Sequence, residues 1–219
     1  MKELLEDFFG KHYKSTKRAI AESRFLQGNI ELSDSKACDD CRRHSYEIEV
    51  KCNKVVLKCN SSEHIIEVVE LENFINQFAH LKALPSRRKC DLLLVGDDKI
   101  VFCDMSCTKA VYIDPYLMND QTSKMGKRII AMEQITSSVG LLMQVPQIAS
   151  EIKNKKDKIA LFAYRKKSES AGDDFDKSVS HNINAFNVMG NKVFQEPMFT
   201  DIGNDFFFTE ICYPNTYIW

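Results

Sequence analysis

Two short apolar runs separated by a polar turn form the clearest pattern in the chain. Residues 92–95 and 100–103 are apolar throughout, and Gly96, Asp97 and Asp98 between them are typical turn residues. Neither run alternates with polar residues, which indicates strands buried on both faces. The sequence therefore predicts a β-hairpin in the middle of a sheet rather than at its edge.

The length of the turn predicts which residues of the two strands face each other. A loop of two or four residues pairs Val95 with Ile100 and, in the same register, Asp91 with Asp104. Directly opposed Cβ atoms lie roughly 4.5–5.5 Å apart, where like charges are destabilising. A bound cation, a raised pKa of one carboxyl group, or basic neighbours would each relieve the repulsion. A three- or five-residue loop would instead place the two aspartates on opposite faces.

The rest of the pattern predicts helices and strands on both sides of this hairpin. We expect helices over 1–27, 63–81, 124–145, 148–154 and 175–189, strands over 158–165 and 191–202, and a hairpin joining 46–52 to 55–59. The chain is expected to divide into 1–61, an N-terminal helix with a cysteine-containing hairpin, and a core over 62–219. The aromatic tail over 204–219 favours a strap across the core, with a docking patch for a partner as the alternative.

Composition narrows the classes of function. The 219 residues are 44% hydrophobic with a net charge of −1, so no overall basic field exists to attract nucleic acid, although basic residues cluster locally. No run approaches the ~18 apolar residues of a membrane span, and the first residues lack a signal-peptide pattern. We therefore expect a cytoplasmic protein with no membrane partner, whose cysteines are free thiols rather than disulfides.

One pair of cysteines has the spacing of zinc ligands. Cys38 and Cys41 are separated by two residues, but Cys52 and Cys59 are seven apart and do not form a second such pair. Reduced thiols are therefore expected in preference to a structural zinc. A small zinc-dependent binding protein is the weakest of the functions considered.

Three short motifs follow one another in the order of a known nuclease core. Asp91 begins the first strand of the hairpin, Asp104-Met105-Ser106 ends the second, and Gln134 follows Glu133 on the next expected helix. On these motifs, residues 62–200 resemble the restriction-endonuclease-like, or PD-(D/E)XK, nuclease superfamily. The resemblance implies an α/β fold with a mixed central sheet flanked by helices.

The resemblance also implies a magnesium- or manganese-dependent site. Asp91 and Asp104 would bind the metal, which polarises a scissile phosphate, and Gln134 would orient water or ligand. Ser106 stands where the superfamily has a lysine. Lys89 faces Ser106 in the predicted register and is therefore the residue expected to take the lysine's role, ahead of Lys109 and Lys127. Lys89 could equally neutralise a metal-free pair of aspartates.

Two functions follow from these expectations. The first is a metal-dependent nuclease, with DNA favoured over RNA, acting alone or within a defence or DNA-processing assembly. The second is a catalytically inactive nuclease fold that binds a protein partner through its N-terminal helix or its aromatic tail.

Overall fold

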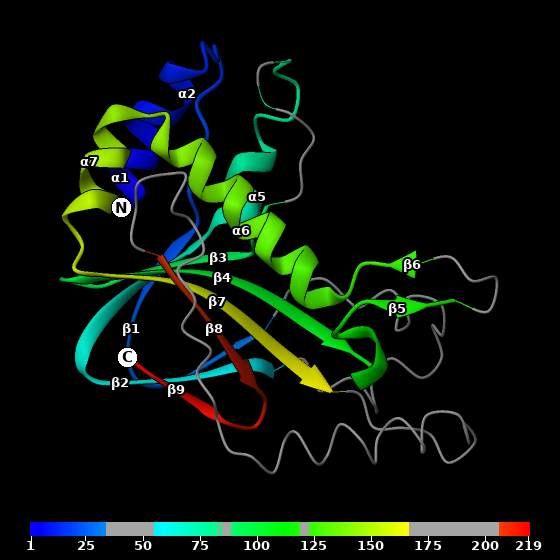
Figure 1. Cartoon of the computed structure of the whole chain (residues 1–219). Coiled ribbons are helices and arrows are strands. Elements are labelled where there is room, and N and C mark those ends of the chain that lie inside the picture. The colour runs from blue at the N-terminus through cyan, green and yellow to red at the C-terminus, as the bar shows by residue number, and fades with distance from the viewer. Residues whose placement is uncertain (34–54, 83, 85–88, 119–122, 167–205) are drawn as a thin grey trace, which may run out of the picture.

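A mixed seven-stranded sheet is the frame of the molecule (Figure 1). The computed structural model describes residues 1–33, 55–82, 84, 89–118, 123–166 and 206–219. The strand order is β1-β2-β3-β4-β7-β8, with β9 beside β2. The pairs β1–β2, β2–β3 and β3–β4 are antiparallel, whereas β4–β7, β7–β8 and β2–β9 are parallel. The strands are β1 (Ser23–Ser33), β2 (Val55–Glu70), β3 (Leu92–Val95), β4 (Lys99–Thr108), β7 (Asp157–Lys166), β8 (Phe206–Cys212) and β9 (Thr216–Ile218).

The helices gather on one face of this sheet (Figure 1). An N-terminal helix is formed by α1 (Lys2–Leu4), a π-helical turn η1 (Leu5–Phe9) and α2 (Gly10–His12), and it is followed by α5 (Leu71–Asn76), α6 (Lys127–Met143) and α7 (Pro146–Asn154). Between β4 and α6 the chain forms a 3-10 turn η2 (Ala110–Tyr112) and a two-stranded sheet of β5 (Tyr116–Leu117) and β6 (Ser123–Lys124). No described helix combines the length and apolar character needed to cross a membrane.

Both faces of the sheet are buried, which explains the unbroken apolar runs of β3 and β4. Leu93 and Phe102 pack under the helices, whereas Leu94 and Val101 pack into a second cluster on the other face. The long β1–β2 ribbon supplies the cover for that second face, because its far half curls beneath β3, β4 and β7 (Figure 1). The ribbon's pairing shifts next to Gly28, whose φ of +82° favours glycine.

The helix expected over 63–81 is largely wrong. Residues 63–70 continue strand β2, and only Leu71–Asn76 form helix α5. The apolar residues Ile66 and Val68 face one core and Val69 faces the other, so this segment is buried on both sides. β-branched side chains pack well on a pleated, doubly buried strand, and this tertiary fit outweighs the helical spacing of the same residues.

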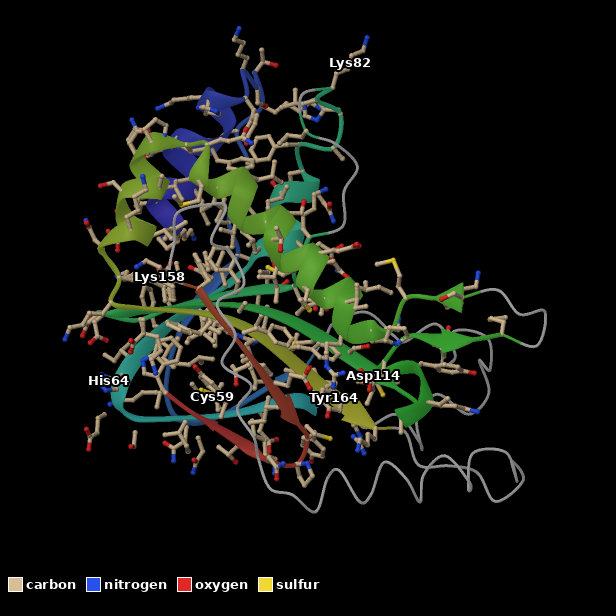
Figure 2. The ribbon with its side chains drawn as sticks, viewed as in Figure 1. Cys59, His64, Lys82, Asp114, Lys158 and Tyr164 are labelled. Carbon is tan, nitrogen blue, oxygen red and sulfur yellow. The ribbon has the colours of Figure 1, made fainter. Side chains whose placement is uncertain are left out.

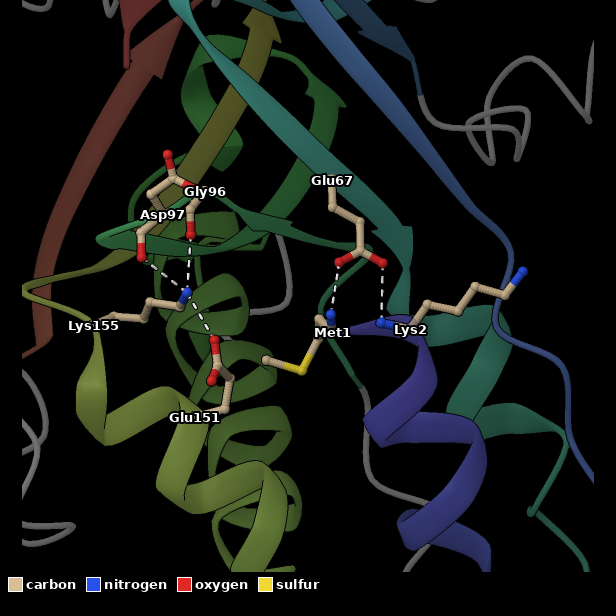
Figure 3. A network of polar contacts seen from close by, with 7 residues as sticks. All are labelled: Met1, Lys2, Glu67, Gly96, Asp97, Glu151 and Lys155. Atoms are coloured by element: carbon tan, nitrogen blue, oxygen red, sulfur yellow. Dashed lines mark hydrogen bonds and ion pairs between the residues drawn. The ribbon is translucent and has the colours of Figure 1, made fainter.

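The N-terminal helix is shorter than expected and packs on its own core. It ends at His12, and strand β1 begins at Ser23, within the segment expected to be helical. Leu5 and Phe9 are fully buried, and the Phe9 ring packs against Phe74 of α5 with centroids 5.5 Å apart. Glu67 of β2 anchors the helix start, because its carboxylate accepts hydrogen bonds from the Met1 amino group at 2.8 Å and the Lys2 N–H at 2.9 Å (Figure 3).

The expected strap role of the aromatic tail is confirmed for its last residues. Tyr217 and Trp219 pack on the second core, and the Trp219 N–H donates to the Asn60 carbonyl at 3.0 Å. A Cβ added to Gly96 would lie 2.8 Å from the Trp219 ring, so the tail lies directly against the β3–β4 turn. The ammonium of Lys99 lies 5.3 Å from the centroid of the same ring.

The helices expected over 124–145 and 148–154 are confirmed as α6 and α7, and the strand expected over 158–165 is confirmed as β7. Several expectations fall on residues outside the described ranges. They are the first strand of the 46–59 hairpin, Cys38, Cys41 and Cys52, the helix over 175–189 and the strand over 191–202.

Candidate functional site

The β3–β4 hairpin has the predicted register. The Gly96 N–H donates to the Lys99 carbonyl at 2.9 Å, which closes a two-residue loop. The strands pair Val95 with Ile100 and, at their far end, Leu92 with Cys103. Asp91 lies one residue beyond the last pair of the ladder, where the same register would bring it opposite Asp104, on the helix-bearing side of the sheet that Leu93 and Phe102 share.

Asp91 lies where the chain leaves the regular ladder. Its Oδ2 accepts a hydrogen bond from the Met105 N–H at 2.7 Å, a donor that a regular antiparallel ladder would pair with the carbonyl of Cys90. The carboxylate therefore replaces a backbone acceptor and lies against β4, the strand that carries Asp104. Asp91 is half-buried, whereas Asp104 is only 5% exposed.

Helix α5 holds the backbone of Asp91 from one side. The first two N–H groups of this helix, those of Leu71 and Glu72, donate to the Asp91 carbonyl at 3.0 and 3.3 Å. Helix N-termini carry N–H groups without intrahelical partners, and here a carbonyl from another segment satisfies them. The position of Asp91 is thus set by the end of β2, where α5 begins.

Helix α6 holds the two preceding residues from the other side. The Oγ of Ser138 accepts the Cys90 N–H at 2.9 Å, and Gln134 Nε2 donates to the Lys89 carbonyl at 3.0 Å. Gln134 and Ser138 are four residues apart and so share one face of the helix. Gln134 was predicted from the sequence and does lie beside this segment, whereas Ser138 was missed, although its spacing from Gln134 was a usable signal.

Asp91 and Asp104 both affect two buried thiols at the end of the hairpin. Burial raises the pKa of the Cys90 thiol, a hydrogen bond with Ser138 opposes the rise, and the charges of Asp104 and Asp91 add to it. Burial followed by the charges of Asp91 and Asp104 likewise raises the pKa of the Cys103 thiol. Both aspartates therefore act on both thiols, which stay protonated and uncharged in the core at neutral pH.

Lys89, two residues before Asp91, directs its ammonium toward α5. Its side chain is buried, and Nζ lies 3.4 Å from the Asn76 Oδ1, a long hydrogen bond. Burial lowers the pKa of Lys89, and the carboxylate of Glu72 opposes that shift. Asn76 and Glu72, both on α5, are partners of Lys89 that the sequence pattern did not indicate.

Ser106, the position of the missing lysine, is half-buried on β4 and pairs with Tyr164 of β7. The other two lysines considered as substitutes lie further along the chain. Lys109 follows the last residue of β4, and Lys127 is the first residue of α6.

The carboxyl ends of the parallel strands form the edge at which this site lies. Arg128, near the start of α6, forms ion pairs with Glu210 of β8 and with Asp114, and so joins three segments. Figure 2 shows Asp114 beside the end of β4 and Tyr164 near the end of β7. Ligands of α/β proteins commonly bind at the carboxyl ends of parallel strands.

The donors present suit a hard divalent cation better than zinc. Among the described residues, no group of three or more histidine, cysteine or acidic side chains is arranged as a metal site. Asp91 and Asp104 provide carboxylate oxygens only, and Mg²⁺ is commonly held by one or two carboxylates while water and substrate phosphate complete its octahedron. The pair therefore fits magnesium or manganese, whereas the cysteines that bear on zinc, Cys38 and Cys41, lie outside the described ranges.

Comparison of the chain with protein-family models, with curated proteins and with solved structures found no match.

Proposed function

We propose that this chain has a restriction-endonuclease-like fold and acts as a magnesium- or manganese-dependent nuclease. The observation that supports the proposal is the register of the β3–β4 hairpin, which would bring Asp91 opposite Asp104 one residue beyond the ladder, with the backbone around Asp91 held by α5 and α6. Two opposed carboxylates are costly in a folded protein unless a cation or a proton offsets their repulsion. A metal-binding role explains why a folded chain keeps them there.

Each residue has a defined part in this proposal. Asp91 and Asp104 would hold the metal, whose chemistry when bound would be to polarise the phosphate and to lower the pKa of a water. The half-buried Asp91 keeps one oxygen on the Met105 N–H, which fixes the orientation of the carboxylate that would meet the cation. Gln134 sets the backbone position of Lys89 and thereby acts as a positioning residue.

Lys89 is the proposed substitute for the lysine that Ser106 replaces. Its lowered pKa leaves a larger neutral fraction near neutral pH than an exposed lysine has, as a proton acceptor requires. In the structure, the ammonium of Lys89 lies 3.4 Å from the Asn76 Oδ1. To act in this role, the ammonium would have to give up this hydrogen bond and turn toward the aspartates.

The test is cleavage of labelled DNA and RNA, single-stranded and duplex, with Mg²⁺, Mn²⁺ or EDTA. We expect metal-dependent cleavage that Asp91→Asn and Asp104→Asn each reduce by at least about a hundredfold, as loss of a metal ligand or its electrostatic contribution implies. Asp97→Asn is the matched control, because Asp97 is an exposed aspartate in the turn of the same hairpin. Titration of Mn²⁺ by calorimetry should lose its binding signal in the same two variants.

The competing function is an inactive nuclease fold that binds a protein. The serine at position 106 and the direction of Lys89 toward α5 favour it, but the apolar side of its expected docking helix, with Leu5 and Phe9, is buried in the core. Wild-type protein that cleaves none of the substrates and binds no Mn²⁺ would refute the nuclease and favour this second function.

A further inference from the structure

The connection between β4 and α6 presents aromatic and basic side chains together. Tyr112 is 38% exposed, and its ring packs against Tyr116 with centroids 4.7 Å apart and planes inclined by 47°. Lys124 on β6 is exposed, and Lys127 at the start of α6 is half-exposed. Tyr112 is thus accessible to a ligand, and two cations lie within this connection and at its end; the connection from β4 to α6 is called the excursion below.

The positive charge of these lysines is not consumed by neighbouring carboxylates. Over the described part of the chain, neither Lys124 nor Lys127 forms an ion pair, because Asp114 and Glu210 both pair with Arg128. Residues 109–128 carry four basic side chains and two acidic ones, Asp114 and Asp120. This part of the sequence therefore has a net charge of +2 in a chain whose net charge is −1.

The base of the excursion is fixed to the core. The Arg128 N–H donates to the Ile113 carbonyl at 3.0 Å, and Gly126 packs so closely that an added Cβ would lie 2.3 Å from the backbone of Asp114. The excursion begins directly after β4, the strand that carries Asp104 (Figure 1). The aromatic pair is therefore held at a constant position relative to the proposed metal site.

We propose that Tyr112, Lys124 and Lys127 bind single-stranded nucleic acid, with a base stacked on the exposed Tyr112 ring and backbone phosphates on the two lysines. Base faces are available to an aromatic ring only where bases are unpaired, whereas a duplex presents groove edges and phosphates. The inference rests on the proposed nuclease function, since it names the class of substrate that would reach Asp91 and Asp104. Both single-stranded DNA and single-stranded RNA have the required chemistry.

The test is fluorescence anisotropy with a labelled 12-nucleotide single strand, as DNA and as RNA, and with the matching duplex, all in EDTA. We expect the wild type to bind the single strand more tightly than the duplex, and Tyr112→Ala to weaken that binding roughly 5- to 100-fold, as loss of one stacked base implies. Tyr112→Phe should bind like the wild type, because stacking needs the ring and not the hydroxyl. Lys124→Gln and Lys127→Gln should each reduce the slope of log affinity against log salt by about 0.7.

Two control variants separate this surface from general effects. Phe25→Ala removes an aromatic ring that is 71% exposed on β1, and Lys153→Gln removes an exposed lysine of α7, on the other side of the helical layer; neither should change the affinity. Equal affinity for duplex and single strand, or unchanged binding by Tyr112→Ala, would overturn the inference. Because EDTA excludes metal-dependent cleavage, failure of the nuclease assay would leave this result standing, and failure here would leave cleavage to be judged by Asp91→Asn and Asp104→Asn.

Discussion

Replacing Lys155 by methionine is expected to loosen the turn that sets the register of the site. The ammonium of this buried lysine donates to the carbonyls of Gly96 at 2.9 Å and Asp97 at 3.1 Å and pairs with Glu151 at 2.8 Å (Figure 3). Three acceptors from two segments therefore converge on one cation, which joins the end of α7 to the β3–β4 turn. Methionine keeps the length and much of the volume of the side chain but donates no hydrogen bond.

The magnitude follows from what each acceptor loses. Gly96 is buried, so its carbonyl would lose a charge-assisted hydrogen bond and find little water in exchange, at a cost of about 1–3 kcal/mol. Asp97 is exposed and its carbonyl can be hydrated, so its loss is smaller. Folding of the variant also avoids the free-energy cost of removing an ammonium from water, which offsets part of the loss. We expect a net destabilisation of about 2 kcal/mol, or roughly 4–8 °C in Tm for a chain of this size.

The assay is urea denaturation followed by circular dichroism, with Lys156→Met as the matched control. Lys156 is the next residue and is exposed, so its replacement should change the free energy of unfolding by less than about 0.5 kcal/mol. Glu151→Gln isolates the ion pair within the network. Its carboxylate is 36% exposed and four residues from Lys155, so its loss should cost no more than about 0.5 kcal/mol. If Lys155→Met is as stable as Lys156→Met, the turn is not held by this lysine and the reasoning is refuted.

Two further perturbations test the packing and the charge around the site. Gly126→Ala should destabilise by about 3 kcal/mol in the same assay, because its Cβ would meet the Asp114 backbone at 2.3 Å, whereas Gly140→Ala, with no atom within 4 Å, should stabilise α6 by roughly 0.5–1 kcal/mol. Equal effects of the two alanines would contradict the packing described. For Lys89→Met, the compared quantity is the difference in unfolding free energy between wild type and variant as a function of pH. The folded-state pKa of Lys89 lies below its ordinary value of 10.5. Between these two pKa values the unfolded chain therefore binds more protons than the folded chain, so the wild type should gain stability relative to the variant as pH rises toward 10.5. A difference that stays constant or falls over this range would show that burial does not lower the pKa of Lys89.

The network around Asp91 holds this residue against β4 whatever its chemical role. The hairpin brings the two strands into register, but the last ladder position is irregular, and the Asp91 carboxylate accepts the Met105 N–H there. The adjoining backbone is satisfied by α5 and by Ser138 of α6. Substitution of Ser138 or displacement of α5 would therefore reach the site without touching either aspartate.

The hairpin was predictable because its determinants are local. Gly96, Asp97 and Asp98 specify a two-residue loop, and a two-residue loop leaves a single antiparallel register. The expected opposition of Asp91 and Asp104 is an extension of that register by one residue beyond the ladder. Helices α6 and α7 were also predictable, since Pro146 separates them and proline is well accommodated in a first helical turn.

Strand β2 was not predictable in the same way because its determinants are distant. The spacing of Ile66, Val69 and Phe74 suits a helix, yet pairing with β1 and β3 and burial on both faces make residues 63–70 a strand. Lys89 shows the same limit at the level of a side chain. The length of the turn predicted that Lys89 faces Ser106. The direction of its ammonium depends instead on Asn76 and Glu72 of α5, a helix whose position only the packed structure defines.

By itself, the sequence determined the central hairpin, its register, the pair Asp91 and Asp104, and the absence of a lysine at position 106. Only the tertiary structure decided which backbone groups hold Asp91, where Lys89 directs its charge, and that the β1–β2 ribbon and the residues Tyr217 and Trp219 cover the second face of the sheet. The physical reason is range. Turn chemistry and strand pairing act between residues close in sequence, whereas burial and polar satisfaction depend on segments that meet only after the chain has folded.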